Sequence, residues 1–330
     1  MRTDGADALG ALTLLITGAA GHVGRATVAM ARARGHQVRA VVRRAGTVPP
    51  GWQNDPGIAV HVADLAQPEK ALNAALATVD VVIHAAAAMA GSDAVHERDT
   101  VLATRRLVMA MPKGMPLVLV SSLAVYAGDL PPGSLIDETT PMEPTPGLRD
   151  AYCRAKLAQE EVARMVRGPL RIMRPGAVWG PGHLWNGHLG IALGPVLLRL
   201  GEKGPIPLCH VDHCALALIL GAECRDGTEV VNVIDDDLPD RAQYIAALRQ
   251  NGWPRLVVPL TWRLPDLVAA RASQGDSFHR TSRLPGLLRR PTLRARMMPL
   301  RYDNAALHRL GWAPLHGFDA GMLAALEADR

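Results

Sequence analysis

A glycine-rich turn near the N-terminal end constrains the fold of this chain more than any other feature. An apolar run at residues 12–17 precedes the turn and predicts a buried parallel strand, and the residues after it predict a helix that ends near Gly35. Glycines let a turn bend tightly and approach a pyrophosphate, and the helix N-terminus offers unpaired N–H groups and a positive dipole. We therefore favour a dinucleotide-binding loop over an ordinary turn. The expected contacts are Gly18, Ala20, Gly21, His22, Val23 and Gly24.

Strands and helices then alternate along the first half of the chain. Further strands are expected at residues 38–42, 60–62, 79–84, 117–120 and 170–173, and helices at residues 68–76, 95–109 and 150–166. Alternation of short apolar strands with helices predicts an α/β fold with a doubly wound parallel sheet of the Rossmann type.

Glycine and proline become frequent after Pro175, which indicates a change in architecture. Strands at 206–211 and 229–233, with a helix at 212–222 between them, are expected to return to the first domain. We therefore predict a dinucleotide-binding domain of residues 1–181 together with 206–236. A smaller substrate-binding domain is predicted from residues 182–205 and 237–330. Within it, the apolar segment 189–200 is expected to line the substrate cleft or the domain junction.

Charge argues against a nucleic-acid partner. The formal net charge is +5, yet seven arginines and no acid lie between Arg280 and Arg301, and the remaining 29 basic and 31 acidic residues nearly balance. Segment 280–301 is best interpreted as a solvated surface. A lid that pairs with a charged substrate such as a diphosphate is an alternative. An anionic membrane surface is disfavoured but left open, because the apolar residues lack helical periodicity.

Cysteine content and hydropathy favour an intracellular enzyme. The chain has four cysteines, too few for a disulfide framework, and no apolar run of the roughly 20 residues that span a membrane. The early acidic residues and short apolar run predict no signal peptide. We expect a cytoplasmic protein with a small-molecule substrate, and a homodimer remains open.

Tyr152 and Lys156 share one face of the helix expected at 150–166, because they are four residues apart. An unperturbed phenol is a poor acid or base at neutral pH, and a nearby ammonium is expected to lower its pKa. Lys156 is also one of only four lysines in a chain rich in arginine. The pair therefore predicts a proton-transfer site, although such spacing also occurs by chance on helices.

Ser121 and Ser122 follow the strand expected at 117–120. Substrates bind at the carboxyl ends of strands in such sheets, where a hydroxyl can hold a carbonyl and stabilise a developing alkoxide. A helix-capping serine is the alternative.

The end of the second strand bears on the choice of dinucleotide. An acidic residue there would hold the ribose hydroxyls of NAD, but the chain has Arg43 and Arg44, which can pair with the 2′-phosphate of NADP. NADP is therefore favoured over NAD, with Arg25 as a further candidate contact. Asp64, followed by Leu65, is expected to accept from the adenine amino group, with a simple turn or a helix cap as the alternative.

Seven motifs, taken in order, resemble the extended short-chain dehydrogenase/reductase family, also called the NAD-dependent epimerase/dehydratase family. They are TGAAGHVG at 17–24, VIHAA at 82–86, SSLAVY at 121–126, YCRAK at 152–156, RPGAVWGPG at 174–182, HVD at 210–212 and LGWAP at 310–314. The resemblance covers nearly the whole chain and implies a Ser–Tyr–Lys catalytic set of Ser122, Tyr152 and Lys156. It places Ser121, Ala85, Ala86 and Pro175 beside the dinucleotide, and it makes His84 structural.

One departure from the family pattern narrows the chemistry. Dehydratases of this family carry an Asp-Glu pair after the Ser or Thr, where this chain has Leu123-Ala124. We therefore disfavour dehydration and favour ketone reduction or alcohol oxidation. A sugar-nucleotide epimerase with tightly bound NAD is the alternative, and a non-catalytic dinucleotide sensor is a second one.

The segment Cys209-His210-Val211-Asp212-His213-Cys214 contains residue types that bind metals. Its spacing matches no standard zinc pattern, and a strand running into a helix points these side chains in several directions. We expect no metal site, and we expect Asp212 to be the helix N-cap.

Overall fold

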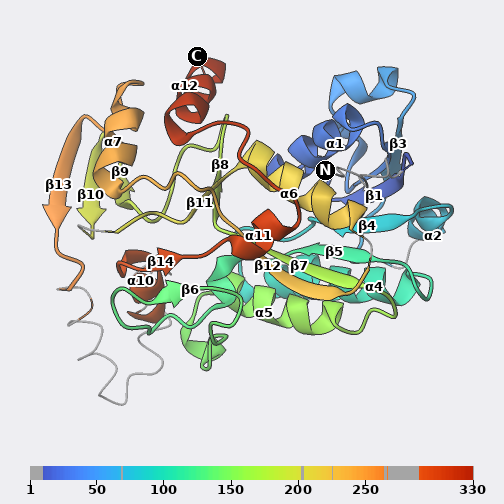
Figure 1. The fold of residues 1–330 in the computed structure, drawn as a ribbon, viewed down its shortest axis with the longest axis horizontal. Helices are drawn as coiled ribbons and strands as arrows, with labels where there is room; N and C mark the ends of the chain where they lie inside the picture. Colours follow the sequence, from blue (N-terminus) through green and yellow to red (C-terminus); the bar gives the residue numbers. More distant parts are fainter. Residues whose placement is uncertain are drawn as a thin grey trace, which may run out of the picture.

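A seven-stranded parallel sheet forms the centre of the molecule (Figure 1). The computed structural model describes residues 10–67, 70–201, 204–224, 226–263, 266 and 290–329. In spatial order the strands are β12 (Thr228–Val233), β7 (Leu170–Pro175), β5 (Leu117–Val120), β4 (Val81–His84), β1 (Thr13–Thr17), β2 (Gln37–Val42) and β3 (Ile58–Val62). The predicted doubly wound Rossmann-type sheet is confirmed.

Helices cover both faces of this sheet, because successive strand residues point to opposite sides. In β1, Leu14 and Ile16 join one buried cluster, which includes side chains of α1 (His22–Ala33) and α6 (Val211–Glu223). Leu15 joins the cluster on the opposite face, to which three other helices contribute. They are α2 (Lys70–Leu76), α4 (Ala103–Ala110) and α5 (Ala151–Ala163).

The order of the strands determines where a ligand can bind. β1 lies between β2 and β4, so the chain leaves β1 towards one side of the sheet and leaves β4 towards the other. A crevice opens at such a switch point, beyond the carboxyl ends of the strands. The glycine turn after β1 and the Ala85-Ala86 segment after β4 both lie there.

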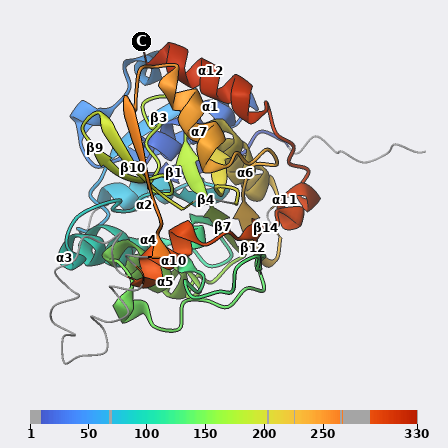
Figure 2. The same ribbon diagram turned by 90° about the vertical axis from the view of Figure 1, so that its left-hand side faces the viewer.

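A second group of elements packs beside the sheet (Figure 2). Its three-stranded sheet has the order β13 (Leu256–Leu260), β10 (Val196–Leu200), β9 (Gly190–Leu193). Leu189 and Leu197 are buried with Trp179, Tyr244 and Phe318, side chains that include members of α7 (Arg241–Arg249) and α12 (Phe318–Ala328). Segment 189–200 thus forms a hairpin that packs on this cluster.

The two strands expected to return to the first domain behave differently. β12 extends the central sheet beside β7, whereas β11 (Leu208–His210) pairs with β8 (Ala177–Trp179) in a separate sheet. α11 (Ala305–Arg309) lies within the predicted second domain but packs on the cluster of the central sheet. The division of the chain into two domains stays a prediction.

Several short elements complete the described chain. They are α3 (Asp93–His96), a π-helical segment (Glu97–Leu102), α10 (Arg290–Met297), the 3₁₀ turns at 45–47, 50–54, 123–125 and 146–148, and the paired strands β6 (Leu135–Ile136) and β14 (Arg301–Tyr302). The helix expected at 95–109 is confirmed, since residues 93–110 are helical throughout and Glu97–Leu102 form a π-helical stretch within them. Of the arginine-rich segment 280–301, residues 280–289 lie outside the described part. Among the described residues, no helix combines the length and apolar character needed to cross a membrane.

Helix caps explain two of the boundaries. α5 begins at Ala151 because the Asp150 carboxylate accepts a hydrogen bond from the Cys153 N–H at 2.8 Å. The expectation that Asp212 caps α6 is wrong: α6 begins at Val211, and the N-cap is His210, whose Nδ1 accepts from the Asp212 N–H at 3.3 Å. The imidazole takes the capping role, so the Asp212 carboxylate faces solvent in the first turn of the helix.

Candidate active site

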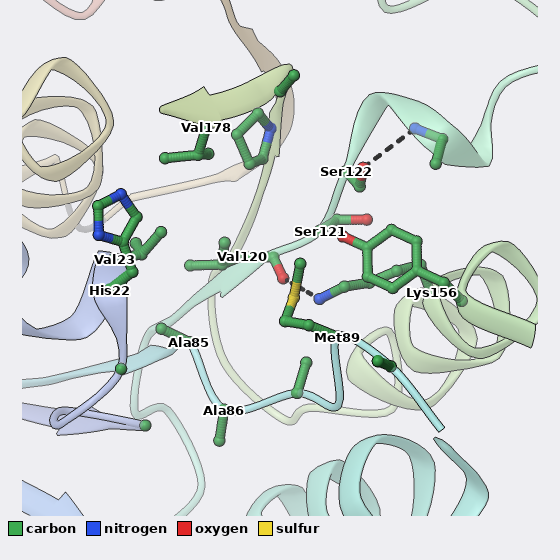
Figure 3. A pocket seen from close by; sticks show the side chains of 18 of the residues that line it. His22, Val23, Ala85, Ala86, Met89, Val120, Ser121, Ser122, Lys156 and Val178 are labelled. Carbon is green, nitrogen blue, oxygen red and sulfur yellow. Dashed lines mark hydrogen bonds between the residues drawn. The ribbon is translucent and has the colours of Figure 1, made fainter. Parts of the chain in front are cut away.

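A cavity of about 1220 Å³ opens at the carboxyl ends of the central strands. All the residues predicted from the sequence to act in catalysis or dinucleotide binding line this cavity, from Gly18 at one end to Ser122 and Tyr152 at the other. Figure 3 shows His22, Ala85, Ser122 and Lys156 around the same space. None of the described residues that line it comes from 189–200, so the first of the two alternatives for this segment, the cleft, is wrong, and the domain junction stays a prediction. Within the hairpin, Leu189, Leu197 and Leu200 are buried, whereas Leu193 is 54% exposed.

The glycine turn fits a pyrophosphate because side chains are excluded from it. Gly18 has a φ of +64°, and a Cβ there would lie 2.8 Å from the Cα of Ala86. A Cβ on Gly24 would lie 2.1 Å from the Gly18 carbonyl oxygen. The N-cap of α1 is Gly21, which has no capping side chain, so the first N–H groups of the helix remain for an anionic ligand. The cavity therefore suits a dinucleotide.

Ser122 and Tyr152 meet at the other end of the cavity. The Ser122 Oγ accepts from the Ala124 N–H at 3.1 Å, so the capping alternative describes part of its role. Burial raises the pKa of Tyr152, and the nearby Ser122 hydroxyl partly opposes that rise. The sequence led us to expect a lowered phenol pKa, and in this structure the direction is the opposite, because desolvation of the phenolate outweighs its polar contacts.

Lys156 projects from α5 beneath Tyr152. Its Nζ lies 5.9 Å from the centre of the Tyr152 ring and donates to the Val120 carbonyl and to the Gln159 Oε1, each at 2.9 Å. The side chain is only 4% exposed. Burial lowers the pKa of Lys156 from 10.5 to about 7, and the Glu160 carboxylate partly offsets the fall.

This shifted pKa predicts how stability depends on pH. The unfolded chain keeps the Lys156 proton up to about pH 10.5, whereas the folded protein releases it near pH 7. Folding therefore releases a proton between these values, and the free energy of unfolding gains up to about 1.4 kcal/mol per pH unit there. The variant Lys156→Met lacks this gain, so its Tm relative to wild type should fall as the pH rises from 7 to 9. Thermal unfolding of the cofactor-free proteins measures this, and a constant Tm difference would contradict the assignment.

A buried hydrogen-bond network links Lys156 to the glycine turn. The Gln159 Nε2 donates to the Thr104 Oγ1 at 3.0 Å, and the same oxygen lies 2.8 Å from the His84 Nε2. The His84 Nδ1 lies 2.6 Å from the Thr17 Oγ1, the last residue of β1. The prediction that His84 is structural is consistent with these contacts. Gln159 and Thr104 were missed, since no local motif marks them.

The Ser121 hydroxyl is hydrogen-bonded to the buried ion pair between Glu160 and Arg174. Its hydroxyl donates to the Glu160 Oε1 at 2.6 Å, and Arg174 binds both oxygens of that carboxylate at 2.9 and 2.7 Å. Ser121 borders the cavity with its hydroxyl committed to Glu160. The sequence missed Glu160, although its position one helical turn after Lys156 was a usable signal.

Four charged side chains gather at the end of the cavity near β2. The Arg43 Nη1 donates to the Asp99 Oδ2 at 3.0 Å, and Arg98 pairs with both Asp99 and Asp64. Arg43 is 53% exposed, so the side chain can turn to a ligand. Asp99 and Arg98 were not predicted. They lie in the π-helical stretch of the helix at 93–110, far in the sequence from the strand end that carries Arg43.

Comparison with known proteins places the chain in a family. A model of the NAD dependent epimerase/dehydratase family matches residues 14–253. A ceramide reductase from Caulobacter vibrioides is 30% identical over 267 residues, which cover 76% of this chain and 73% of that protein.

Two solved structures, both in complex with NAD, share the fold. MoeE5 with UDP-glucuronic acid and NAD is 22% identical, covers 96% of this chain and 98% of its own, and has a TM-score of 0.70. The UDP-glucose 4-epimerase of Thermus thermophilus is 19% identical, covers 97% and 99%, and has a TM-score of 0.67. The match over most of the chain, together with the glycine turn and the central sheet, shows that this protein is an enzyme of the NAD-dependent epimerase/dehydratase family, the extended short-chain dehydrogenases/reductases.

Proposed function

We propose that this enzyme is an oxidoreductase that interconverts a ketone and an alcohol with a catalytic set of Ser122, Tyr152 and Lys156. The observation that carries the proposal is that Ser122, Tyr152 and Lys156 line the cavity that also contains the glycine turn, with the Lys156 Nζ 5.9 Å from the centre of the Tyr152 ring. A dinucleotide sensor would need only the glycine turn, so the presence of all three side chains at one site favours an enzyme.

Each residue has a defined task in the proposed reaction. The reduced nicotinamide, when bound, supplies a hydride to the carbonyl carbon. Ser122 donates a hydrogen bond to the carbonyl oxygen and orients it. The Tyr152 hydroxyl gives its proton to that oxygen as the alcohol forms, and takes it back in the reverse direction. Lys156 stabilises the resulting phenolate and holds the ribose.

The same site offers little for dehydration. Leu123 and Ala124 form a 3₁₀ turn after Ser122 and have no acidic group. Asp150 also lines the cavity, but its carboxylate caps α5. No dedicated acid therefore lies beside Ser122 among these residues to protonate a leaving hydroxyl.

A lipid-like ketone is the substrate class that we favour. Apolar side chains are part of the lining of the cavity, and the relative of 30% identity is named for ceramide. The apolar lining includes Met89, Leu123, Ile136, Trp185 and Leu300. An aliphatic chain would gain about 25 cal/mol for each Å² of surface that it buries there.

The epimerase alternative retains support from the solved structures that share the fold, several of which hold NAD and a UDP-sugar or are named as epimerases. An epimerase needs the same three side chains but keeps its dinucleotide bound and shows no net consumption of it. The two functions therefore differ in an easily measured property.

The test combines two assays on the purified enzyme. Incubation with NADPH and the ketone form of a ceramide should give steady loss of absorbance at the nicotinamide band, together with the alcohol. Incubation with UDP-glucose should give no epimer. Epimer formation, with NAD released only on denaturation and no turnover with the ketone, would establish the alternative.

We also propose that the enzyme prefers NADP to NAD, because Arg43 follows β2, lines the cavity and is exposed enough to pair with a 2′-phosphate. Charge-assisted hydrogen bonds contribute about 1.5–3 kcal/mol, so Arg43→Ala should raise the KM for NADPH by about tenfold or more. The KM for NADH should change little, which makes NADH the internal control. Preference of the wild-type enzyme for NADH would contradict the proposal.

The cytoplasmic location and the homodimer stay predictions.

A further inference from the structure

Five of the chain's 12 histidines gather around the N-terminus of α6. His210 and His213 come from the end of β11 and the start of α6, and His316 lies between α11 and α12. The ring of His316 lies 4.4 Å from each of the other two. His22 of the glycine turn stacks on His183 at 3.8 Å, and burial together with the neighbouring His183 and His210 lowers the pKa of His22 to about 4. Residues distant in sequence thus form one imidazole-rich cluster.

Two of these histidines and one carboxylate lie close enough together to share an ion. Each of His210, Asp212 and His316 offers a ligand atom, and the three atoms lie within 4.8 Å of one another. The Asp212 Oδ2 lies 3.8 Å from the His210 Nδ1, which caps α6, so the His210 Nε2 is the ring nitrogen left for an ion. His210 is buried, His316 is partly exposed and Asp212 is 52% exposed, so an ion has access from solvent.

His213 is not one of these three groups, but it holds the backbone of the segment that carries His316. Its Nδ1 is 2.8 Å from the Asp235 Oδ1, and its Nε2 accepts from the backbone N–H groups of Leu315 and His316 at 3.0 and 3.4 Å. Both ring nitrogens are therefore occupied, and they fix the backbone that carries His316. Such outer contacts orient the first ligands of a metal site.

Two imidazoles and one carboxylate match the chemistry of zinc. Zn²⁺ accepts nitrogen and oxygen ligands, and three protein ligands leave a fourth position for water or another side chain. His22 lies beside this group, and its Nε2 is buried without a hydrogen-bond partner among the described residues. It lines the dinucleotide cavity and is not one of the three converging ligands.

We propose that His210, Asp212 and His316 bind a divalent zinc-type ion. The ion fastens the segment around His316 to the N-terminus of α6, next to the glycine turn. This inference replaces our expectation that segment 209–214 has no metal site. The reason for that expectation holds for part of the segment: Cys209 and Cys214 are buried in the apolar core and take no part. The missing ligand was His316, about 100 residues further along the chain.

The experiment measures metal binding directly. Chelator-treated full-length protein is titrated with Co²⁺, whose visible absorption reports the ligand geometry, and then with Zn²⁺ against a chromophoric chelator. We expect one equivalent per chain. We also expect a rise in Tm of about 4 °C when free Zn²⁺ is 100-fold above its Kd.

Three variants locate the site. His316→Gln and Asp212→Asn should each weaken binding about tenfold or more and abolish the rise in Tm. His308→Gln is the matched control, because His308 lies in the same C-terminal segment but pairs with Asp236. It should bind Zn²⁺ as the wild type does. No stoichiometric binding by wild type, or unchanged affinity in both His316→Gln and Asp212→Asn, would overturn the proposal. Circular dichroism of the metal-free variants confirms that they fold.

Discussion

Tyr152→Phe should lower kcat by about 10²- to 10⁴-fold, the usual range for loss of a general acid–base group. The substitution removes the hydroxyl that gives or takes the proton but keeps the ring. The ring packs edge-on against His96 at 6.3 Å and over Lys156, so the fold around it should be retained. Steady-state reduction of the ketone, with thermal unfolding as a check of the fold, measures the effect.

Tyr126→Phe is the matched control for this substitution. Tyr126 also lines the cavity, but its hydroxyl donates to the Asn232 Oδ1 at 2.7 Å, on the side of β12. Its loss should cost about 1 kcal/mol of stability and leave kcat within a few-fold. Full activity in Tyr152→Phe, or equal losses in the two variants, would contradict the proton-transfer role.

Gly24→Ala should abolish dinucleotide binding and destabilise the protein. Its new Cβ would lie 2.1 Å from the Gly18 carbonyl and 2.8 Å from the Ala19 Cα, both backbone atoms that no side-chain rotation can move. The turn or α1 must shift, and overpacking of this kind typically costs about 1–3 kcal/mol. Because the turn and the helix N-terminus are the expected pyrophosphate site, affinity should fall with stability.

Gly51→Ala provides the comparison for this second substitution. A Cβ on Gly51 would meet no atom within 4 Å, and the residue has no positive φ, so the Tm and the affinity of this variant should stay near wild type. Calorimetric titration with NADPH and thermal unfolding test both variants. Wild-type affinity in Gly24→Ala would show that the turn tolerates a side chain and does not hold the dinucleotide closely.

The central sheet was predictable because its strands contain short apolar runs, and because residues such as glycine mark the ends of the neighbouring helices. Gly35 ends α1 with a positive φ of 85°, as a helix-ending glycine does. The smaller sheet was not predictable in the same way. β10 pairs in parallel with β13, about 60 residues away, and no local pattern in either strand specifies that partner.

The candidate active site likewise has residues that the sequence predicted and residues that it did not. Residues within motifs, such as Ser122 and Tyr152, were assigned to one cavity because each follows a strand or begins a helix at the same edge of the sheet. Thr104 and Asp99 were missed, because they join the site through contacts between elements that are distant in the sequence. Gln159 was missed although it contacts Lys156 on the same helix, because no motif marks it. The pKa of Tyr152 was misjudged for a related reason. Spacing on a helix indicates a neighbour such as Lys156 but does not measure burial.

The direct test of the proposed reaction is transfer of a labelled hydride. The enzyme is incubated with NADPH that carries deuterium at nicotinamide C4 and with the ketone form of a ceramide, and the lipid is analysed by mass spectrometry. The proposal predicts an alcohol with one deuterium on the former carbonyl carbon, formed by wild type and not by Tyr152→Phe. An unlabelled lipid, with the labelled NADPH unconsumed, would contradict it.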